Sequence, residues 1–331
     1  MQDRYAGDVG DYGKIGLLKC LQEHGFTIGV NWYRVPELDV EKKKDGSFKQ
    51  DDGKYLIPDA ITECNPVLAE KLTTIAKGDR SVISIQNAAF IPNAVYYDEY
   101  LTVANRNEWH EQAKKLFENV NLVFMDPDNG LLVKSVGKRS VRSVKYAFYE
   151  EVKEYIDSGK SVLIYNHRCR KAERKYFDDI EGKLQEELKV YRNVIQAITF
   201  PKGSIRDYFA IPACKDHYEM FHEAFADMKK SKWGQLGVCR LFPEWADAIH
   251  TRYMTYDESV FVDVESESFN KGCSFEEYCR DVVRYLMLCG YGYSEEHAVA
   301  LTNRNIDVLK KSFSEKEPVA DLAIDLGYQC G

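Results

Sequence analysis

The sequence predicts an α/β fold with a mostly parallel sheet, because strand-like and helix-like segments alternate along the first 243 residues. Apolar runs at 122–125 and 161–165 have the length of buried strands, and each stops in polar residues. Two further strand-like segments, at 191–200 and 207–213, are separated by a short connection rich in turn formers. We therefore expect this last pair of strands to be antiparallel.

The remaining elements follow from hydrophobic periodicity and turn signals. A helix is expected after Asp11, which could cap it, with Ile15, Leu17, Leu18 and Leu21 facing inward. Residues 36–53 are charged and indicate an exposed excursion. Further strands are expected at 27–35 and 81–86, and helices at 59–77, 105–119, 146–158, from about 168 to 188, and 215–231.

A change in composition near residue 243 divides the chain into two predicted parts. Residues 244–331 hold 17 acidic and 8 basic residues, whereas residues 1–243 hold 36 and 37. We expect 1–243 to form the α/β domain and 244–331 to form a small acidic helical region, with helices near 274–289, 294–303, 304–313 and 318–326. The acidic helical region is a candidate for binding a protein partner.

The overall composition is typical of a soluble globular protein. Hydrophobic residues make up 44% and charged residues 30% of the 331 positions. No apolar run reaches the roughly 18 residues of a membrane span, and the first residues lack the apolar segment of a signal peptide. The nine cysteines are scattered and include no CxxC pair. These features favour reduced thiols and a cytoplasmic location over disulfides or a zinc site.

The stretch Met125-Asp126-Pro127-Asp128-Asn129-Gly130 closes the most apolar strand and is the strongest candidate for a site. Ligands of open α/β sheets bind beyond the carboxyl ends of the strands. Two carboxylates and an amide exceed what a turn requires, although a plain polar turn is the alternative. We expect Asp126 to be solvated there, so that its loss would barely change stability if it serves catalysis.

Two other stretches carry candidate binding residues. Asp3, Asp8 and Asp11 alternate with Gly7, Gly10 and Gly13, which suggests a loop closely approached by a ligand, or else a flexible lead-in. Residues 134–175 hold 12 basic residues against 5 acidic ones. Such an excess is typical of a surface that faces a polyanion, although a solvated helix face would look the same.

Four landmarks in order resemble one family. Tyr5 to Lys14, Phe124 to Asn129, Leu163 to His167, and the pair of strands from Ile198 to Pro212 resemble the bacterial ribosomal RNA adenine-N6 methyltransferases of the RlmJ type. The resemblance implies a Rossmann-like, class I methyltransferase-like fold and S-adenosylmethionine as cofactor. It places Asp126-Pro127-Asp128-Asn129 at the family's Asp-Pro-Pro-Tyr motif and Lys14 at the family's lysine.

The resemblance also implies roles for particular residues. Cofactor-binding residues would be Tyr5, Asp8, Asp11, Lys14 and Asn31. Catalytic residues would be Asp126, Asp128 and Asn129, and substrate-binding residues would be Arg142, Lys145, Tyr165, His167 and Arg168. The sequence departs from the family after its first strand, which ends Asn31-Trp32-Tyr33 without a glycine, and Asn129 replaces the motif's tyrosine.

Three functions remain open at this level. The first is methyl transfer to an amino group of a nucleic acid or nucleotide, in which Asp126 and the Pro127 carbonyl orient the amine. The second is Mg²⁺-dependent phosphodiester or nucleotide chemistry, with Asp8, Asp11, Asp126 and Asp128 as ligands and His167 as acid or base. The third is a catalytically inactive binding protein of the same fold. No His or Cys spacing indicates a resident metal.

Overall fold

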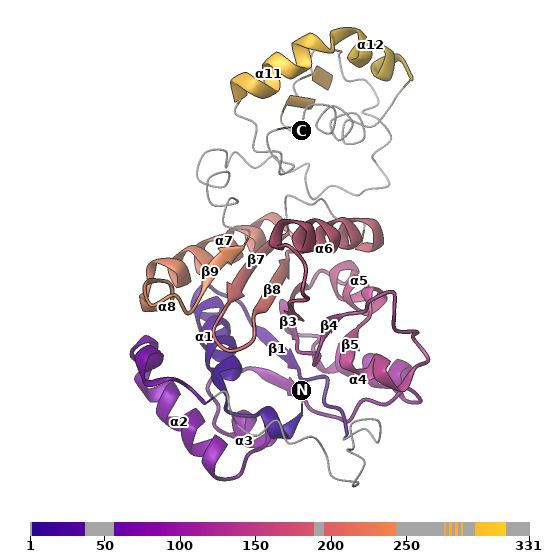
Figure 1. Cartoon of the computed structure of the whole chain (residues 1–331). Coiled ribbons are helices and arrows are strands. Elements are labelled where there is room, and N and C mark those ends of the chain that lie inside the picture. The colour runs from indigo at the N-terminus through magenta and orange to yellow at the C-terminus, as the bar shows by residue number, and fades with distance from the viewer. Residues whose placement is uncertain are drawn as a thin grey trace. The chain divides into compact units, whose positions relative to one another are not determined.

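The computed structural model describes residues 2–36, 56–188, 195–242 and 295–315 and six positions between 275 and 286. A central sheet of seven strands forms the core of the described residues up to 242 (Figure 1). The strands lie in the order β2-β1-β3-β6-β8-β7-β9. Their bounds are β1 Ile28–Asn31, β2 Val95–Tyr97, β3 Leu122–Met125, β6 Ser161–His167, β7 Gln196–Phe200, β8 Arg206–Ile211 and β9 Arg240–Phe242.

The sheet is mostly parallel. β1 pairs in parallel with β2 and β3, and β3 pairs in parallel with β6. β8 runs antiparallel to both β6 and β7, and β9 runs antiparallel to β7. The predicted α/β class and the antiparallel relation of the last predicted strand pair are therefore confirmed.

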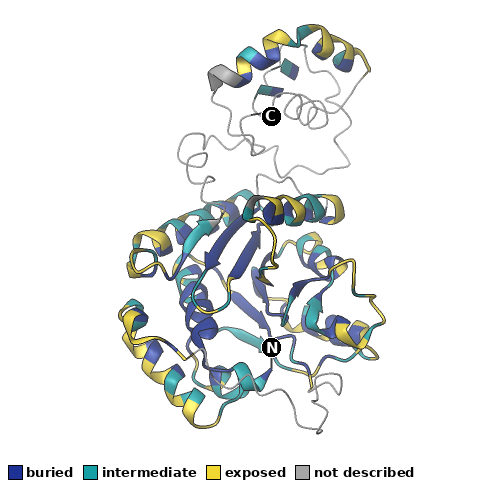
Figure 2. Ribbon diagram, viewed as in Figure 1, coloured by how far each residue is buried: buried dark blue, intermediate teal, exposed yellow. Residues whose placement is uncertain are grey.

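One face of the sheet is covered by the N-terminal helices and by α7. Successive strand residues point to opposite faces, so Ile28, Val30, Leu122 and Phe124 share this face. They belong to one apolar cluster with residues of α1 and α7. The elements that contribute to this side are α1 Val9–Glu23, η3 Asp59–Cys64, α2 Pro66–Lys77, α3 Val82–Asn87, α7 Lys215–Lys230 and α8 Lys232–Gln235. Figure 2 shows the central strands buried between helices whose outer faces are exposed.

The opposite face packs against three further helices. Gly29 leaves room for the ring of Phe117. A Cβ atom at position 29 would lie only 2.6 Å from the Phe117 Cδ1 atom. Phe209 of β8 contacts Tyr176 and Phe177, with ring centroids 6.3 and 6.2 Å away. These helices are α4 Arg106–Leu116, α5 Tyr149–Asp157 and α6 Glu173–Leu188. The sheet is thus the middle of three layers.

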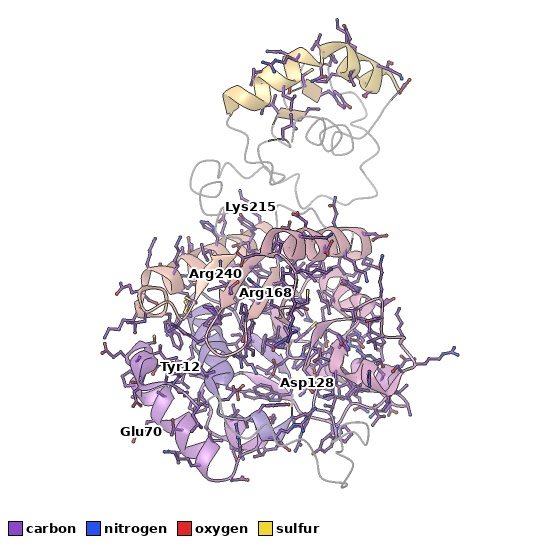
Figure 3. The ribbon with its side chains drawn as sticks, in the orientation of Figure 1. Tyr12, Glu70, Asp128, Arg168, Lys215 and Arg240 are labelled. Carbon is purple, nitrogen blue, oxygen red and sulfur yellow. The ribbon has the colours of Figure 1, made fainter. Side chains whose placement is uncertain are left out.

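The helix α1 begins where Asp8 caps it. The Asp8 carboxylate accepts hydrogen bonds from the backbone N–H groups of Gly10 and Asp11, at 2.7 and 3.0 Å. The expectation that Asp11 caps this helix was therefore wrong. The Tyr12 hydroxyl then ties α1 to the η3 segment by donating to the Ile61 carbonyl at 3.1 Å (Figure 3).

The glycines of α1 serve packing and not a loop around a ligand. A Cβ at Gly10, Gly13 or Gly16 would lie 2.5–2.6 Å from side-chain atoms of Arg206, Phe200 and Trp233, respectively. These glycines recur every third residue, so they line one side of the helix and let side chains of β7, β8 and α8 approach its backbone. The expectation of a loop at Gly10 and Gly13 is therefore wrong, because both residues lie in α1.

Several predicted elements changed type or length. Residues 81–86 form the helix α3, capped by Ser81, and not a strand, while β2 was not predicted. The basic helix begins at Glu173 rather than near Arg168 and continues through Gly182. The predicted 59–77 helix is split by Asn65, which caps α2. Within α4, Leu116 lies on the outer face of the helix, where it is 45% exposed.

The chain separates into two compact units, one of residues 1–188 and 195–244 and the other of residues 189–194 and 245–331. In the second unit the structure describes α11 Glu295–Arg304 and α12 Ile306–Glu315, with an apolar cluster that includes Tyr278, Leu286 and Leu301. The predicted excursion at 36–53, apart from Pro36, the acidic residues 257–268 and the helix predicted at 318–326 lie outside the described residues. In the described part, no helix is long and apolar enough to cross a membrane.

Candidate functional site at the carboxyl ends of β1 and β3

The site is placed by the direction in which the chain leaves two neighbouring strands. From β1 the chain continues to β2 on one side, and from β3 it continues to β6 on the other side. Such a reversal of strand order is where open α/β sheets bind ligands. We call the carboxyl ends of β1 and β3 the switch point. Asn31 ends β1, and the Asp126 N–H donates to the Asn31 carbonyl at 2.9 Å.

A buried lysine lies at the switch point. Lys14 of α1 donates to Asp11 at 2.8 Å and to Asp126 at 2.7 Å, and its ammonium lies 5.5 Å from the centre of the Trp32 ring. The side chains of Lys14 and Asp126 are only 5% and 4% exposed. The prediction that Asp126 is solvated at an open strand end is therefore wrong.

The charge of Lys14 is maintained by its two carboxylate partners. Burial disfavours the ammonium form, but Asp11 and Asp126 outweigh burial and hold the pKa of Lys14 well above its ordinary value. Removing one partner of a buried pair leaves an uncompensated charge. Asp126 is thus fixed in place by an ion pair that depends on α1.

A second ion pair extends the group of charges. Asp8, at the start of α1, lies 3.4 Å from the Arg206 guanidinium of β8. Burial and the neighbouring Asp11 raise the pKa of Asp8, and Arg206 opposes the rise. We call Asp8, Asp11, Lys14, Asp126 and Arg206 the Lys14 cluster. When all are ionised, it holds three negative and two positive charges, an excess of one negative charge.

The hydroxyl of Tyr208 borders the Lys14 cluster. Tyr208 is fully buried, and its hydroxyl has no hydrogen-bond partner among the residues that the structure describes. Burial raises the pKa of Tyr208, and Lys14, Arg206 and Asp126 are among the charges acting on it. A buried hydroxyl without a partner costs free energy, so it suggests a polar group that binds here.

Asp128 lies two residues further along and has different partners. The Gln2 amide donates to its carboxylate at 2.7 Å, and the Lys145 ammonium lies 3.4 Å away. Burial opposes ionisation, but positive charges that include Lys145, together with the Gln2 hydrogen bond, hold the pKa of Asp128 below its ordinary value. Asp126 and Asp128 therefore face different surroundings despite their spacing.

The turn after Asp128 is shaped by a residue that the sequence did not indicate. Gly130 has φ of +104°, and a Cβ there would lie 2.0 Å from the Asn166 side-chain oxygen. That oxygen accepts a hydrogen bond from the Leu131 N–H at 2.9 Å, and the Asn166 amide donates to the Tyr176 hydroxyl. Asn129 bonds through its backbone, to Lys145 and His167. The Asn-Gly pair was the available signal for this turn.

Beyond Asn31 the backbone turns through a strained residue. Tyr33 has φ of +44°, which is rare for a bulky residue, and its side chain is completely buried. Its ring contacts Trp109, with centroids 4.9 Å apart, and its hydroxyl donates to Glu151. A left-handed turn thus follows β1 at the position where the sequence lacks a glycine.

The end of β6 holds three predicted substrate-binding residues. Tyr165 is buried, and its hydroxyl lies 3.4 Å from the exposed His167 ring. Burial lowers the pKa of His167, and Arg206 lowers it further. Arg168 forms two hydrogen bonds with Asp207, at 2.5 and 2.9 Å, and also pairs with Glu173 (Figure 3). Arg168 therefore serves an internal ion-pair network.

The remaining predicted residues lie on separate segments. Arg142 is exposed in the segment between the short parallel strands β4 Gly130–Leu131 and β5 Tyr146–Ala147, which also includes the 3-10 helix η4 Val141–Lys145. Tyr5 lies in η1 Asp3–Tyr5, with the Arg4 guanidinium 5.0 Å from its ring. The structure thus brings together Asp8, Asp11, Lys14 and Asp126, and joins Asp128 to Lys145.

The described residues include no group of three or more His, Cys, Asp and Glu side chains arranged to hold a metal ion. Asp8, Asp11, Asp126 and Asp128 are all described, and Lys14 lies between Asp11 and Asp126. The Lys14 ammonium thus occupies the position between two of the carboxylates that the Mg²⁺ hypothesis requires. The geometry gives that hypothesis no support.

Comparison with known proteins identified no relative. No protein-family model matches the sequence, and neither curated proteins nor solved structures yield a match.

Proposed function

We propose that this chain is a methyltransferase-like enzyme that transfers a methyl group to an amino group of a nucleic acid or nucleotide. The observation that carries the proposal is Asp126, held by Lys14 at the switch point directly after β3. β1, β3, β6 and the β7–β8 hairpin occur where the resemblance to class I methyltransferases expects its first, fourth and fifth strands and its closing hairpin. This correspondence supports the proposal as an analogy of fold.

In the proposed reaction, the protein acts by orienting the amine that accepts the methyl group. The Asp126 carboxylate and the Pro127 carbonyl would accept hydrogen bonds from an exocyclic amine and so aim its lone pair. Burial raises the pKa of Asp126 and Lys14 opposes the rise, while the ion pair with Lys14 fixes the direction of the carboxylate. Because Asp126 is only 3% exposed, an amine reaches it only after neighbouring side chains move.

The surroundings fit S-adenosylmethionine in charge. The cofactor supplies a methyl group on a positively charged sulfonium, and the Lys14 cluster, when all of its members are ionised, has one excess negative charge to match it. The left-handed turn at Tyr33 provides the tight backbone reversal after β1, although a tyrosine and not a glycine adopts it. Asp8, Asp11 and Asn31 are the side chains we assign to the cofactor.

Calorimetry with S-adenosylmethionine tests the proposal. The wild-type protein should bind it, and Asp11→Asn should weaken binding by at least about tenfold, the effect of losing one charged hydrogen bond. Lys171→Ala removes an exposed ion pair with Asp179 and is the matched control, which should bind normally. Absence of binding to the wild type, or binding of Mg²⁺ that Asp126→Asn abolishes, would contradict the proposal.

The nucleic acid part of the proposal is supported by the basic segment between β4 and β5. Lys134, Lys138, Arg139 and Arg142 are exposed there, and Lys145 connects the segment to Asp128. Exposed lysines and arginines bind phosphates without reading sequence. This segment would hold the backbone of a strand whose base approaches the switch point.

The Arg139→Ala/Arg142→Ala variant tests this surface with a single-stranded RNA oligonucleotide. Affinity should fall, and the slope of log K against log salt should become shallower by about 0.7 for each lost phosphate contact. Lys153→Ala is the control, because Lys153 is exposed but paired with Asp157 on α5. Equal affinity and equal slope in the two variants would remove the basic segment from the proposal.

A further inference from the structure

A buried ion pair outside the predicted site links both sides of the switch point. Arg106 of α4 and Glu151 of α5 form two hydrogen bonds, at 2.6 and 2.8 Å, and each side chain is 7% exposed. The Arg106 guanidinium also stacks on the Phe148 ring, 3.4 Å from its centre. Nothing in the sequence pattern indicated this pair.

Arg106 holds the segment that carries Lys145. Its guanidinium donates to the carbonyls of Ser143 and Tyr146, at 3.1 and 2.7 Å. Lys145 lies between these two residues, its carbonyl accepts from the Asn129 N–H at 3.0 Å, and its ammonium faces Asp128. A continuous chain of contacts therefore runs from Arg106 to the turn after β3.

Glu151 contacts the segment that follows β1. Its carboxylate accepts from the Tyr33 hydroxyl and from the Phe148 N–H, both at 2.9 Å, as well as from Arg106. Tyr33 is the strained residue after β1, and strain of this kind persists only where surrounding contacts impose it. The ion pair thus reaches the backbone beyond β1 as well as that beyond β3.

The pair is better explained by geometry than by stability. Replacing a buried ion pair by apolar residues is often neutral for stability, so such a pair is weak evidence of a stabilising role. The planar guanidinium fixes direction, because its donors have rigid positions that a flexible lysine lacks. Here the guanidinium bonds the carboxylate and two carbonyls of separate segments at once.

We propose that Arg106 is a positioning residue: through Glu151 it sets the turn at Tyr33, and through the Ser143 and Tyr146 carbonyls it places Lys145 and Asn129 at the tip of β3. The inference rests on the proposed function only in treating the switch point as the reacting centre. The contacts that define it do not depend on the cofactor or substrate.

The Arg106→Met/Glu151→Leu double variant tests the inference, because it replaces the pair by apolar side chains of similar size. Two readouts are measured in the whole protein by NMR: the titration of the Asp128 carboxyl and hydrogen exchange of the Asn129 and Leu132 amides. We expect the pKa of Asp128 to rise toward its ordinary value as Lys145 moves away. Both amides, which donate to Lys145 and Ala147, should exchange at least about tenfold faster.

Glu154→Gln is the matched control. It breaks an ion pair between the same two helices, with Lys114 of α4, but Glu154 forms no hydrogen bond with residues 143–146, all of which the structure describes. A purely structural role for the α4–α5 contact would move the readouts equally in both variants and would overturn the inference. So would a folded double variant whose Asp128 titration and amide exchange match the wild type.

If the double variant does not fold, Arg106→Lys decides the question with the same readouts, because it keeps the charge and loses the fork of donors. Neither readout uses S-adenosylmethionine. A protein that fails to bind the cofactor but shows the expected changes would therefore contradict the proposed function and leave the positioning role in place.

Discussion

β3 and β6 are both followed by a charged residue, Asp126 and Arg168, but these two residues have different ion-pair partners. At β3, Asp126 is joined to Lys14, which is 112 positions away in the sequence, in a cluster of three carboxylates and two basic side chains. At β6, Arg168 is held between Asp207 and Glu173, and Glu173 also binds Arg240. The β3 end holds more carboxylates than basic side chains, whereas the β6 end is an internal network.

The comparison shows that a charged residue at a strand end defines a candidate and not a site. Sequence reasoning placed Asp126 and Arg168 on the same footing, as catalytic and substrate-binding residues. Their partners distinguish the two residues. The Arg168 guanidinium already donates to the carboxylates of Asp207 and Glu173 and to the Thr199 hydroxyl, the last at 3.0 Å. We therefore propose the exposed segment 134–142, rather than Arg168, as the candidate phosphate-binding surface.

The largest effect that would test this comparison is expected for Asp126→Ala. Lys14 would be left buried with Asp11 as its remaining carboxylate partner, so the free energy of unfolding should fall by about 3 kcal/mol. Urea denaturation of the variant and the wild type measures the change. Asp126→Asn, which keeps the shape and a hydrogen-bond acceptor, should lose less, and an unchanged midpoint would show that Lys14 does not depend on Asp126.

A smaller effect is expected for Arg168→Ala. Asp207 is completely buried and would keep the Thr199 hydroxyl, at 2.7 Å, but lose both bonds from Arg168. The free energy of unfolding should fall by about 2 kcal/mol, while affinity for single-stranded RNA should stay the same. If affinity fell and stability did not, the β6 end would be a binding surface after all.

The smallest effect concerns acid sensitivity at His110. Burial lowers the pKa of His110 below its ordinary value of 6.5, so the unfolded chain binds more protons than the folded one below that pH. The contribution of neutral His110 is complete above pH 6.5 and is lost as the pH falls toward the folded-state pKa. With His110→Phe, the free energy of unfolding should depend less steeply on pH below 6.5 than it does in the wild type. Parallel curves for variant and wild type would assign the acid sensitivity elsewhere.

The sequence predicted the core of the fold well where apolar runs were long and closed by turn formers. β3 and β6 are examples, because Leu122 to Met125 and Val162 to Ile164 are apolar and fully buried. It failed at Ser81 to Gln86, where a short apolar segment fits a strand and a helix equally well. There the Ser81 cap, which accepts from the Ser84 N–H at 3.0 Å, favours the helix.

The candidate site was predicted in part. Asp8, Asp11, Lys14 and Asp126 were all named from the sequence, but the ion pairs among them and the burial of Asp126 were not. The roles of Arg106, Glu151 and Asn166 were missed, because single charged or amide residues inside helices and strands give no local signal. Several of their partners are distant in the sequence: Leu131 is 35 positions from Asn166, Arg106 is 45 from Glu151, and Tyr33 is 118 from Glu151.

The sequence by itself determined the positions of β1, β3, β6, β7 and β8 and that polar residues end the central strands. These properties depend on hydrophobic periodicity and turn chemistry, which act over a few neighbouring residues. The tertiary structure alone decided that Lys14 meets Asp126, that the glycines of α1 admit Arg206, Phe200 and Trp233, and that Arg106 joins both sides of the switch point. Such contacts depend on which surfaces pack together, and the energy of a buried charge depends on its partners and its distance from water.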